Sequence, residues 1–366
     1  MEENRKERWQ ELALRPTGRF PTVNVYADTL GEAIHKALIG VYEQGIRIET
    51  PKQKADMPLG FDAHVTINVA YPDREPMLHK YALSDSDLGL VQYIYEVTHG
   101  IHNHWKKNPN DPNDNAWGYT YNERFKAQIP FVLAKIKKDF SEKGRATGRD
   151  YFFTIWRPRE DSILEQPDPP CYQNGQIRIV PDDKGELFLD FLTYWRSRDE
   201  AKAWLQNNVA QVRLQKMLAA KISNMLGLEI KVGNYVDTSS SLHIYGLYMQ
   251  RDNFGTFIER MRRAPTADFL MNYSDFVDNE ELSKRIVAAQ MHSEILTGRR
   301  NISAEELASG VDVSELFKSN GVAMMNGEKE IKNLSLKYDI NTFPYPTDWD
   351  TWPKEWDAEP NIKLLT

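Results

Sequence analysis

The only cysteine of the chain, Cys171, is the residue with the clearest capacity for covalent chemistry, and it lies in the stretch PDPPCYQNGQIRIV. Two prolines precede it and a run typical of a β-strand follows, so the thiol is expected to be held stiffly at the start of a strand. A thiolate is a strong nucleophile and also a good leaving group. A lone cysteine is more commonly a small buried hydrophobic residue, so the polar residues around it must decide between the two interpretations.

A second stretch, YWRSRDEAKAWLQNN, offers residues suited to binding a phosphate. Arg196 and Ser197 are adjacent at the end of a predicted strand, Asp199 follows them, and Asn207 lies eleven residues after the arginine. A guanidinium group matches the geometry of phosphate oxygens and a hydroxyl adds a further donor. Taken singly, each of these is an ordinary surface residue.

A third stretch, SSSLHIYG, places His243 and Tyr245 two residues apart on a predicted strand. Side chains at this spacing lie on the same face of a strand, where both could hydrogen-bond to one hydroxylated ligand. Most pairs of this kind are structural, so this motif alone is weak.

The elements that must position these residues are both helices and strands. Thr29 and Glu32 form a capping box before an apolar stripe of helical spacing, and Gly45 is a suitable end for that helix. Two strand patterns flank the turn PDDKG after Cys171, which predicts a hairpin, and a long helix follows through NNVAQVRLQKMLAAKISNMLG. The mixed order predicts an α+β protein with a mixed sheet covered by helices. We expect a polar N-terminal arm (residues 1–20), a catalytic domain (21–300) and a C-terminal extension (301–366).

The composition limits the class of protein. The chain has 366 residues, 41% of them hydrophobic, with a net charge of −7. This balance is typical of a globular protein and disfavours a general nucleic-acid or membrane binder. One cysteine excludes an internal disulfide. No secretory signal is visible in MEENRKERWQ, and no apolar run approaches the ~20 residues that a membrane span needs. We therefore expect a cytoplasmic protein, with no membrane or nucleic-acid partner.

Taken in order, these motifs resemble the thymidylate synthase superfamily. The resemblance covers residues 115 to 248 and includes GYTYNER and FFTIW upstream of the cysteine. It implies a thymidylate synthase-like fold and a homodimer that shares its active sites. It also implies two substrates, a pyrimidine deoxynucleotide monophosphate and 5,10-methylenetetrahydrofolate, and no metal.

The resemblance assigns a role to each candidate residue. Cys171 is the nucleophile that adds to C6 of the pyrimidine, and Tyr121 assists removal of the C5 proton. Arg196 and Ser197 bind the 5′-phosphate. The remaining assignments are Asp199 for the base and nearby backbone, Asn207 for N3 and C4 of the base, and His243 with Tyr245 for the 3′-hydroxyl.

Two further residues follow from the resemblance with less support from spacing. Arg149 matches an arginine that the partner subunit supplies to the phosphate pocket, although Asp150 replaces the second arginine of that pair. Glu96 is the candidate for the catalytic glutamate, but its spacing to Gly100 is shorter than in the standard synthases. The alternative is that Glu96 is an ordinary solvated helix residue.

The chain also departs from the superfamily pattern beside the nucleophile. Tyr172 stands in place of the usual histidine after the cysteine, and Trp195 in place of the usual glutamine before Arg196. The motifs PPCYQ, YTYNER and RSRDEAKAWLQNN resemble the divergent branch that includes phage pyrimidine-nucleotide hydroxymethylases.

The expected reaction is C5 one-carbon transfer to deoxyuridylate (dUMP), with 5-hydroxymethyl-dUMP as the product. An amide at Asn207 suits uracil, whereas a carboxylate there would favour cytosine. The alternatives are a thymidylate synthase, which delivers a hydride in place of water, and a dCMP hydroxymethylase. Two readings come from other classes: a thiol hydrolase using Cys171, Asn207 and His243, and a non-catalytic nucleotide- or RNA-binding homologue.

The C-terminal stretch is rich in tryptophan and proline, and two roles are open for it. Trp349, Trp352 and Trp356 could line a lid over the folate, or they could fasten the extension to the body of the protein. The second role is the commoner one for any single tryptophan.

Overall fold

The computed structural model describes residues 19–48, 58–82, 86–103, 118–164, 168–251 and 254–278, together with residues 280, 283, 356 and 360. Most of the predicted N-terminal arm and nearly all of the predicted C-terminal extension lie outside the described residues. The division of the chain at residues 20 and 300 therefore stays a prediction. Trp349 and Trp352 also lie outside the described residues.

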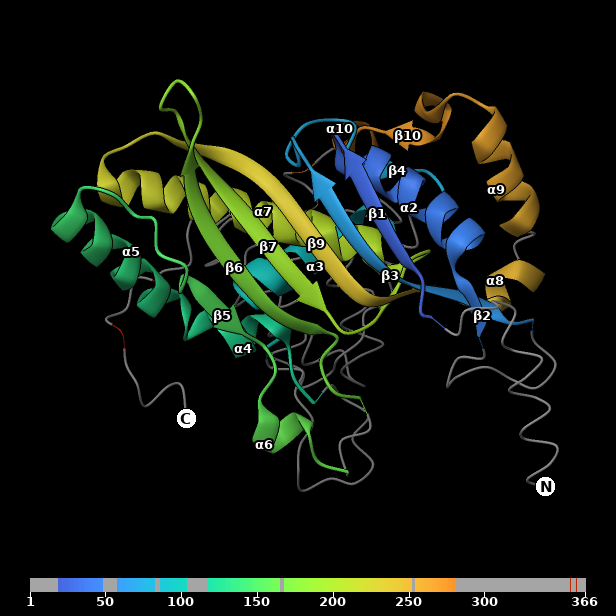
Figure 1. Cartoon of the computed structure of the whole chain (residues 1–366), viewed down its shortest axis with the longest axis horizontal. Helices are drawn as coiled ribbons and strands as arrows, with labels where there is room; N and C mark the ends of the chain where they lie inside the picture. Colours follow the sequence, from blue (N-terminus) through green and yellow to red (C-terminus); the bar gives the residue numbers. More distant parts are fainter. Residues whose placement is uncertain are drawn as a thin grey trace, which may run out of the picture.

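The centre of the fold is an eight-stranded mixed sheet (Figure 1). Its main path runs β1 (Thr22–Ala27), β3 (Gly60–Val69), β9 (Ile230–Ile244), β7 (Leu187–Trp195), β6 (Tyr172–Pro181) and β5 (Phe152–Thr154). The short strands β2 (Ile46–Ile48) and β8 (Arg198–Asp199) pair with β3 and β9. The pairs β1–β3 and β7–β9 are parallel, whereas β3–β9, β5–β6 and β6–β7 are antiparallel.

Helices pack against one face of this sheet. The longest are α7 (Ala203–Leu226), α2 (Leu30–Gln44), α5 (Ile129–Lys143) and α3 (Asp87–His99), and α7 and α3 lie behind the strands in Figure 1. Shorter elements complete the described part: β4 (Leu78–His79), α4 (Tyr121–Lys126), α6 (Pro158–Asp161), α8 (Gly246–Arg251), α9 (Phe254–Arg263), η1 (Thr266–Phe269), β10 (Leu270–Met271) and α10 (Tyr273–Phe276). The predicted α+β class, with a mixed sheet covered by helices, is confirmed. Within the described ranges, no helix is both long and apolar enough to cross a membrane.

The capping residues predicted for the first helix are the ones that begin and end α2. The Thr29 side chain accepts from the backbone N–H of Glu32, and the Glu32 carboxylate accepts from the N–H of Asp28. The helix ends where the N–H of Gly45 donates to the carbonyl of Val41. Capping of this kind satisfies backbone groups that would otherwise lack partners at each helix end.

The predicted hairpin is formed by β6 and β7. Gly185 closes its turn with φ +82°, a left-handed conformation that favours glycine. One boundary differs from the prediction, because the strand predicted to carry both His243 and Tyr245 ends at Ile244, and α8 begins at Gly246. A side chain at Gly246 would collide with the backbone of Pro58, so only glycine fits where the chain turns out of the sheet.

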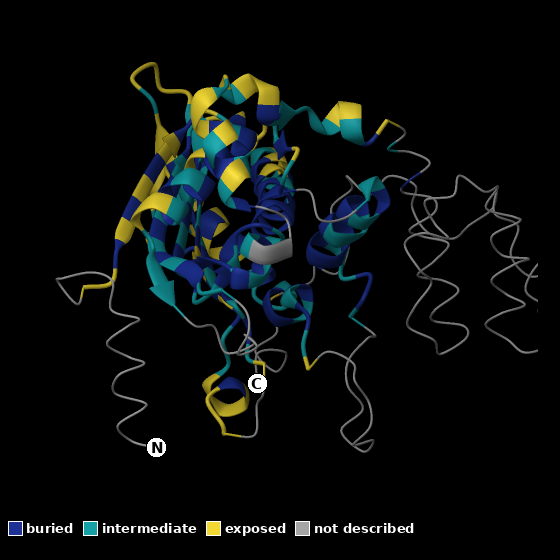
Figure 2. Ribbon diagram, turned by 90° about the vertical axis from the view of Figure 1, so that its right-hand side faces the viewer, coloured by how far each residue is buried: buried dark blue, intermediate teal, exposed yellow. Residues whose placement is uncertain are grey.

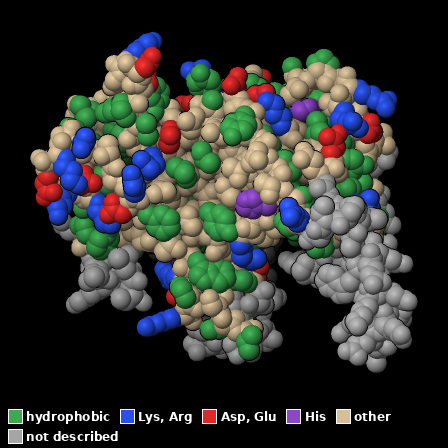
Figure 3. All heavy atoms as spheres, in the orientation of Figure 1, with side chains coloured by type: hydrophobic (Ala, Val, Ile, Leu, Met, Phe, Trp, Pro, Cys, Tyr) green, Lys and Arg blue, Asp and Glu red, His purple; other side chains and the backbone are tan. Residues whose placement is uncertain are grey.

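Side chains alternate along the strands between the helix-covered face and the opposite, open face. Val65 and Ile67 of β3 and Phe191 of β7 are buried towards the helices, whereas Thr66 and Tyr194 point the other way. Figure 2 shows this alternation as bands of buried and exposed residues along the strands, and Figure 3 shows hydrophobic side chains scattered across the open face. The open face therefore has apolar surface that no described helix covers.

A pair of buried histidines joins α2 to the short sheet formed by β4 and β10. His35 Nδ1 lies 3.3 Å from His79 Nε2, and His79 Nδ1 accepts from the N–H of Tyr81 at 3.3 Å. The His79 ring also stacks on Phe269. Burial lowers the pKa of His79 to about 3, so the folded protein holds this ring neutral.

This pair predicts a loss of stability in acid. Because the unfolded chain binds a proton near pH 6.5 and the folded one resists it, stability is lost as the pH falls below 6.5. From His79 alone, unfolding at pH 5 should cost about 2 kcal/mol less than at pH 8. Denaturant unfolding of the wild type and of His79→Asn measures the difference, since asparagine accepts from Tyr81 but does not titrate in this range. Equal pH dependence in the two proteins would contradict the assignment.

Candidate active site

Cys171 lies at the entry of β6, where it is partly buried and takes part in no disulfide. Its carbonyl accepts from the N–H of Arg196 at 2.9 Å, which fixes the thiol opposite the end of β7. The Arg196 side chain returns to the same segment: Nε donates to the carbonyl of Pro170 at 3.0 Å, and Nη2 donates to that of Pro169. Gln173 Nε2 also donates to Pro170, at 2.7 Å. The Pro169–Pro170 segment is therefore braced from two sides.

This brace places the guanidinium of Arg196 next to the Cys171 segment. Arg196 uses two of its five N–H groups on the proline carbonyls, and the others keep donor capacity for an anion. Ser197, partly exposed, follows it directly between β7 and β8. The predicted phosphate-binding pair thus adjoins Cys171, although the bracing role of Arg196 was not foreseen from the sequence.

Three tyrosines lie within electrostatic range of Cys171. A charge on Cys171 is close enough to raise the pKa of Tyr119, Tyr121 and Tyr245, in addition to the larger effect of burial on each. The rings of Tyr119 and Tyr121 lie 6.0 Å apart. All three phenols stay protonated, so they offer neutral hydroxyls and flat apolar faces beside the sulfur.

The two departures from the superfamily pattern pack against each other. Tyr172 and Trp195 are register partners on β6 and β7, and their rings stack at 4.5 Å. Both point into the core, whereas their neighbours Cys171 and Arg196 are only partly buried. Tyr121 meets the two rings edge-on, at 5.6 Å and 5.7 Å. The aromatic pair therefore supports Tyr121 from behind and does not take the place of a residue beside the thiol.

Beneath this aromatic pair lies a buried ion pair. The Arg198 guanidinium lies 4.2 Å from the centre of the Trp195 ring and is paired with the Asp237 carboxylate. It also donates to Asn208 Oδ1 at 2.9 Å and to the Ser239 hydroxyl. Arg198 and Asp237 are each about 1% exposed, so this network is part of the core that holds β7, β9 and α7 together.

Asn207, near the start of α7, is linked to α3. Its Nδ2 donates to the hydroxyl of Tyr93 at 2.6 Å, and Asn207 itself is buried. Tyr93 and Glu96 are three residues apart on α3, hence on one helix face. The charge of Glu96 is close enough to raise the pKa of Tyr93, after burial. Tyr93 thus lies between the predicted base-reading amide and the predicted catalytic carboxyl.

Glu96 is buried, which excludes the interpretation as a solvated helix residue. Its Oε2 lies 3.0 Å from Nδ1 of His102, and burial raises its pKa to about 8. At neutral pH the carboxyl group is therefore mostly protonated and is able to donate a hydrogen bond or a proton.

The end of α3 is fastened to the start of α4. Asn122 Nδ2 donates to the carbonyl of Val97 at 2.9 Å, and Asn103 Nδ2 donates to Asn122 Oδ1 at 2.9 Å. Thr120, which caps α4, donates to Asn103. This network couples the position of Glu96 to that of Tyr121, which begins α4.

The Asp199 carboxylate hydrogen-bonds to the backbone of the turn before α7 and to a side chain of α8. Its Oδ1 accepts from the N–H of Ala201 at 3.0 Å, and its Oδ2 accepts from the Tyr248 hydroxyl. Burial raises its pKa. These contacts place the turn before α7 and so position Asn207.

The rings of His243 and Tyr245 lie against each other, with their centres 4.6 Å apart. Tyr245 lies just beyond the end of β9. His243 is buried, and its Nε2 has no hydrogen-bond partner among the described residues. Ser241 and Asp62 lie on the other side of the imidazole ring.

Arg149 stands apart from this group. It is exposed, and its carbonyl accepts from Gln176 Nε2 at 2.6 Å on the edge of the sheet. No contact of Arg149 with the Cys171 group is found among the described residues. A role for Arg149 within the same chain is therefore unsupported, and its predicted role across a dimer stays a prediction.

Three residues that the sequence interpretation missed belong to this region: Tyr93, Ser241 and Asp62. Tyr93 precedes Glu96 by three residues in a predicted helix, and Ser241 precedes His243 by two in a predicted strand. These spacings could have indicated the first two. No signal in the sequence pointed to Asp62.

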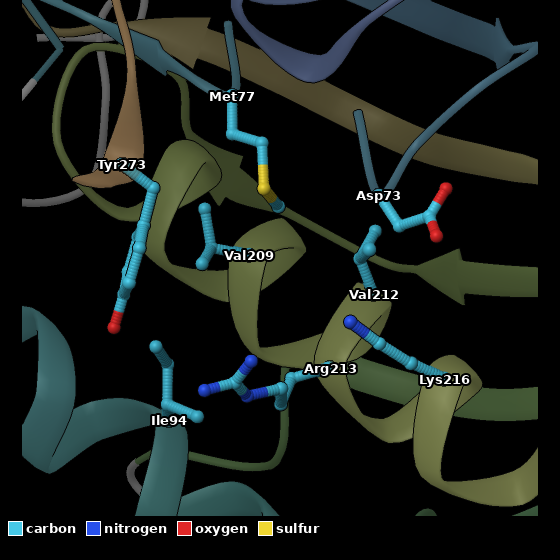
Figure 4. A pocket seen from close by; sticks show the side chains of 8 residues that line it. All are labelled: Asp73, Met77, Ile94, Val209, Val212, Arg213, Lys216 and Tyr273. Carbon is cyan, nitrogen blue, oxygen red and sulfur yellow. The ribbon is translucent and has the colours of Figure 1, made fainter. Parts of the chain in front are cut away.

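A separate pocket lies between α3, α7 and α10 (Figure 4). Ile94, Val209 and Val212 form its apolar lining, and Arg213 and Lys216 lie along one side. None of the predicted site residues lines it. Within the described ranges, no group of three or more histidine, cysteine or acidic residues could hold a metal.

The described structure is thus a mixed sheet with helices on one face and with a cysteine beside an arginine at one end of the strands. Neither a protein-family model nor a curated protein sequence matches the chain. Among solved structures, the chain is similar to the thermostable thymidylate synthase A of Bacillus subtilis, with a TM-score of 0.46 and 16% sequence identity. The match covers 67% of this chain and 95% of that one.

Proposed function

We propose that this protein is a folate-dependent enzyme that transfers a one-carbon unit to C5 of dUMP, with 5-hydroxymethyl-dUMP as its product. The observation that carries the proposal is the placement of Cys171: partly buried, fixed to Arg196 through its backbone, and within electrostatic range of three tyrosines. A cysteine that only filled space would not need a guanidinium and three phenols near it.

The contacts around the thiol support one orientation of the nucleotide. Arg196 and Ser197 bind the 5′-phosphate, Asn207 reads the base edge at N3 and C4, and His243 with Tyr245 binds the 3′-hydroxyl. Asp199 acts indirectly, since its carboxylate holds the turn that leads to Asn207. The pyrimidine ring then lies between the Cys171 sulfur and the amide of Asn207.

The first chemical step is addition of the Cys171 thiolate to C6 of the pyrimidine. The new S–C6 bond moves the ring electrons towards C5 and O4, which makes C5 nucleophilic. Glu96 is suited to stabilise the charge that develops on O4, because its raised pKa keeps it protonated near neutral pH. Its neighbours Tyr93 and Asn207 extend from Glu96 towards the base.

Methylenetetrahydrofolate supplies the one-carbon unit to C5. Tyr121, held against Tyr172 and Trp195, assists loss of the C5 proton as a neutral hydroxyl that orients the accepting water. The flat faces of Tyr119 and Tyr245 suit the stacking of planar rings. Loss of the C5 proton breaks the C–N bond between the one-carbon unit and the folate, so that tetrahydrofolate leaves with no net oxidation. Water then adds to the exocyclic methylene, and departure of Cys171 gives 5-hydroxymethyl-dUMP.

We also propose that the enzyme works as a homodimer that shares its active sites. The open face of the sheet has partly exposed apolar residues, among them Leu192 and Tyr194 of β7. Burying such a face against a second copy is favourable. Arg149 of one subunit would then complete the phosphate pocket of the other.

The test is a product assay with purified protein, methylenetetrahydrofolate and either dUMP or dCMP. We expect dUMP to gain the mass of one CH₂O unit, with no absorbance change from dihydrofolate. Formation of dihydrofolate with a gain of CH₂ would instead identify a thymidylate synthase. Turnover of dCMP alone would contradict the role given to Asn207, and nucleotide binding without any product would favour a non-catalytic homologue.

A further inference from the structure

Asp62 and His243 face each other across two strands with Ser241 between them. Asp62 on β3 is the register partner of His243 on β9. The Ser241 hydroxyl lies 2.9 Å from Asp62 Oδ2 and 3.3 Å from His243 Nδ1. The three side chains therefore form a continuous chain from the carboxylate to the imidazole.

The chemistry of the three groups fixes the direction of the hydrogen bonds. Above its raised pKa of about 7, Asp62 is an ionised carboxylate that only accepts, so the Ser241 hydroxyl donates a hydrogen bond to Asp62. The serine oxygen then presents a lone pair to His243, and the proton of the neutral imidazole lies on Nδ1. His243 Nε2 is left as a hydrogen-bond acceptor.

Nε2 of His243, like Oδ1 of Asp62, has no hydrogen-bond partner within the described structure. This nitrogen is buried, and Tyr245 lies against the same ring. Burial lowers the pKa of His243 to about 4, so the ring is neutral at physiological pH. A buried acceptor without a partner is costly, and a donor from a ligand hydroxyl would satisfy it.

From this arrangement we infer that Asp62 is a positioning residue for the sugar of the nucleotide, acting through Ser241 to hold His243 as an acceptor for the 3′-hydroxyl. The inference rests on the proposed function for the identity of the ligand. Asp62 itself does not touch the nucleotide. Its removal frees the Ser241 hydroxyl to donate to His243 Nδ1, which favours the other tautomer and turns Nε2 into a donor.

The test compares the affinities of dUMP and 2′,3′-dideoxyuridine monophosphate, which lacks only the 3′-hydroxyl. Calorimetry is run at pH 8.5, above the value of about 7 to which burial raises the pKa of Asp62, so that the carboxylate is ionised. We expect the wild type to bind dUMP at least ~10-fold more tightly than the dideoxy analogue. Asp62→Ala should bind dUMP ~5- to 30-fold more weakly, with little change for the analogue.

Three further variants separate positioning from general stability. Ser241→Ala should reproduce the effect of Asp62→Ala, and Asp62→Asn should restore most of the preference because its amide oxygen still accepts from Ser241. Asp190→Ala is the matched control: this partly buried carboxylate on β7 accepts from the N–H of Asn234 and has no contact with His243. Its preference for dUMP should equal that of the wild type.

The failures of the two proposals are distinguishable. A wild-type protein that binds neither nucleotide would overturn the proposed function, and the inference with it. A wild type that prefers dUMP, with the same preference in Asp62→Ala and Ser241→Ala, would overturn the role of Asp62 alone. A loss of affinity for both ligands in equal measure would also overturn it, since that is the result of a purely structural role.

Discussion

Replacing Cys171 by serine is expected to abolish turnover of dUMP while leaving nucleotide binding intact. A serine hydroxyl is almost never ionised at neutral pH, so it cannot add to C6 of the pyrimidine. Loss of a covalent nucleophile lowers kcat by a factor on the order of 10⁴ or more. Because Cys171 is only partly buried and differs from serine by one atom, the dUMP dissociation constant should change less than ~3-fold.

Gln173→Ala serves as the matched control in the same segment. Its amide braces the carbonyl of Pro170 but does not touch the base, so we expect a decrease in kcat of only about tenfold. Product formation is followed by mass spectrometry and binding by calorimetry. Turnover by Cys171→Ser within tenfold of the wild type would remove the basis for covalent catalysis.

The largest effect on stability is expected for Asp237→Ala. This substitution leaves the buried Arg198 guanidinium without its carboxylate, and neither side chain of the pair is more than about 1% exposed. Removing one partner from a buried ion pair costs ~3–5 kcal/mol, because the remaining charge is buried without compensation. The midpoint of denaturant unfolding should therefore fall sharply, with the transition slope unchanged.

Two comparisons isolate this effect. Asp150→Ala breaks the ion pair with Lys135, whose side chains are both more than half exposed, and should cost less than ~1 kcal/mol. Arg198→Met combined with Asp237→Leu removes both charges and should recover much of the stability lost in Asp237→Ala. An equal loss of unfolding free energy in Asp150→Ala and Asp237→Ala would show that burial of the Arg198–Asp237 pair does not increase the cost of breaking it.

The elements that were predicted well are those whose signals are local. Both capping residues of the helix between Thr29 and Gly45 could be recognised from the sequence. The turn at Gly185 joins two strands whose polar and apolar residues alternate. The hairpin also brings Arg196 near Cys171, since Cys171 lies ten residues before Pro181 and Arg196 lies nine after Leu187, the pair that closes the turn. An antiparallel pairing around that turn predicts that they are close. Their observed register also depends on a shift between Tyr172 and Asn174.

The parts of the site that the sequence did not predict depend on contacts between distant elements. Tyr93 meets Asn207 only because α3 packs against α7, and Asp62 meets Ser241 only through the register of β3 with β9. Neither packing angles nor sheet registers are encoded in a local pattern. The stacking of Tyr172 on Trp195 follows the same rule: each was read as an isolated departure, and only the pairing of β6 with β7 shows that they pack as a unit.

The tail tryptophans illustrate the same limit. Trp356 is buried and meets the ring of Phe125 in α4 edge-on, at 5.8 Å. This supports the role of fastening the extension to the body of the protein. A tryptophan among prolines predicts burial somewhere, but its partner is more than 200 residues away in the sequence.

The most direct measurement is the intact mass of the protein after incubation with 5-fluoro-dUMP and methylenetetrahydrofolate, followed by peptide mapping. The fluorine at C5 cannot leave as the proton does, so a covalent complex should accumulate. The account predicts a mass increase equal to the nucleotide plus the folate, located on the peptide that contains Cys171 and absent from Cys171→Ser. An unmodified protein, or an adduct on any other residue, would contradict it.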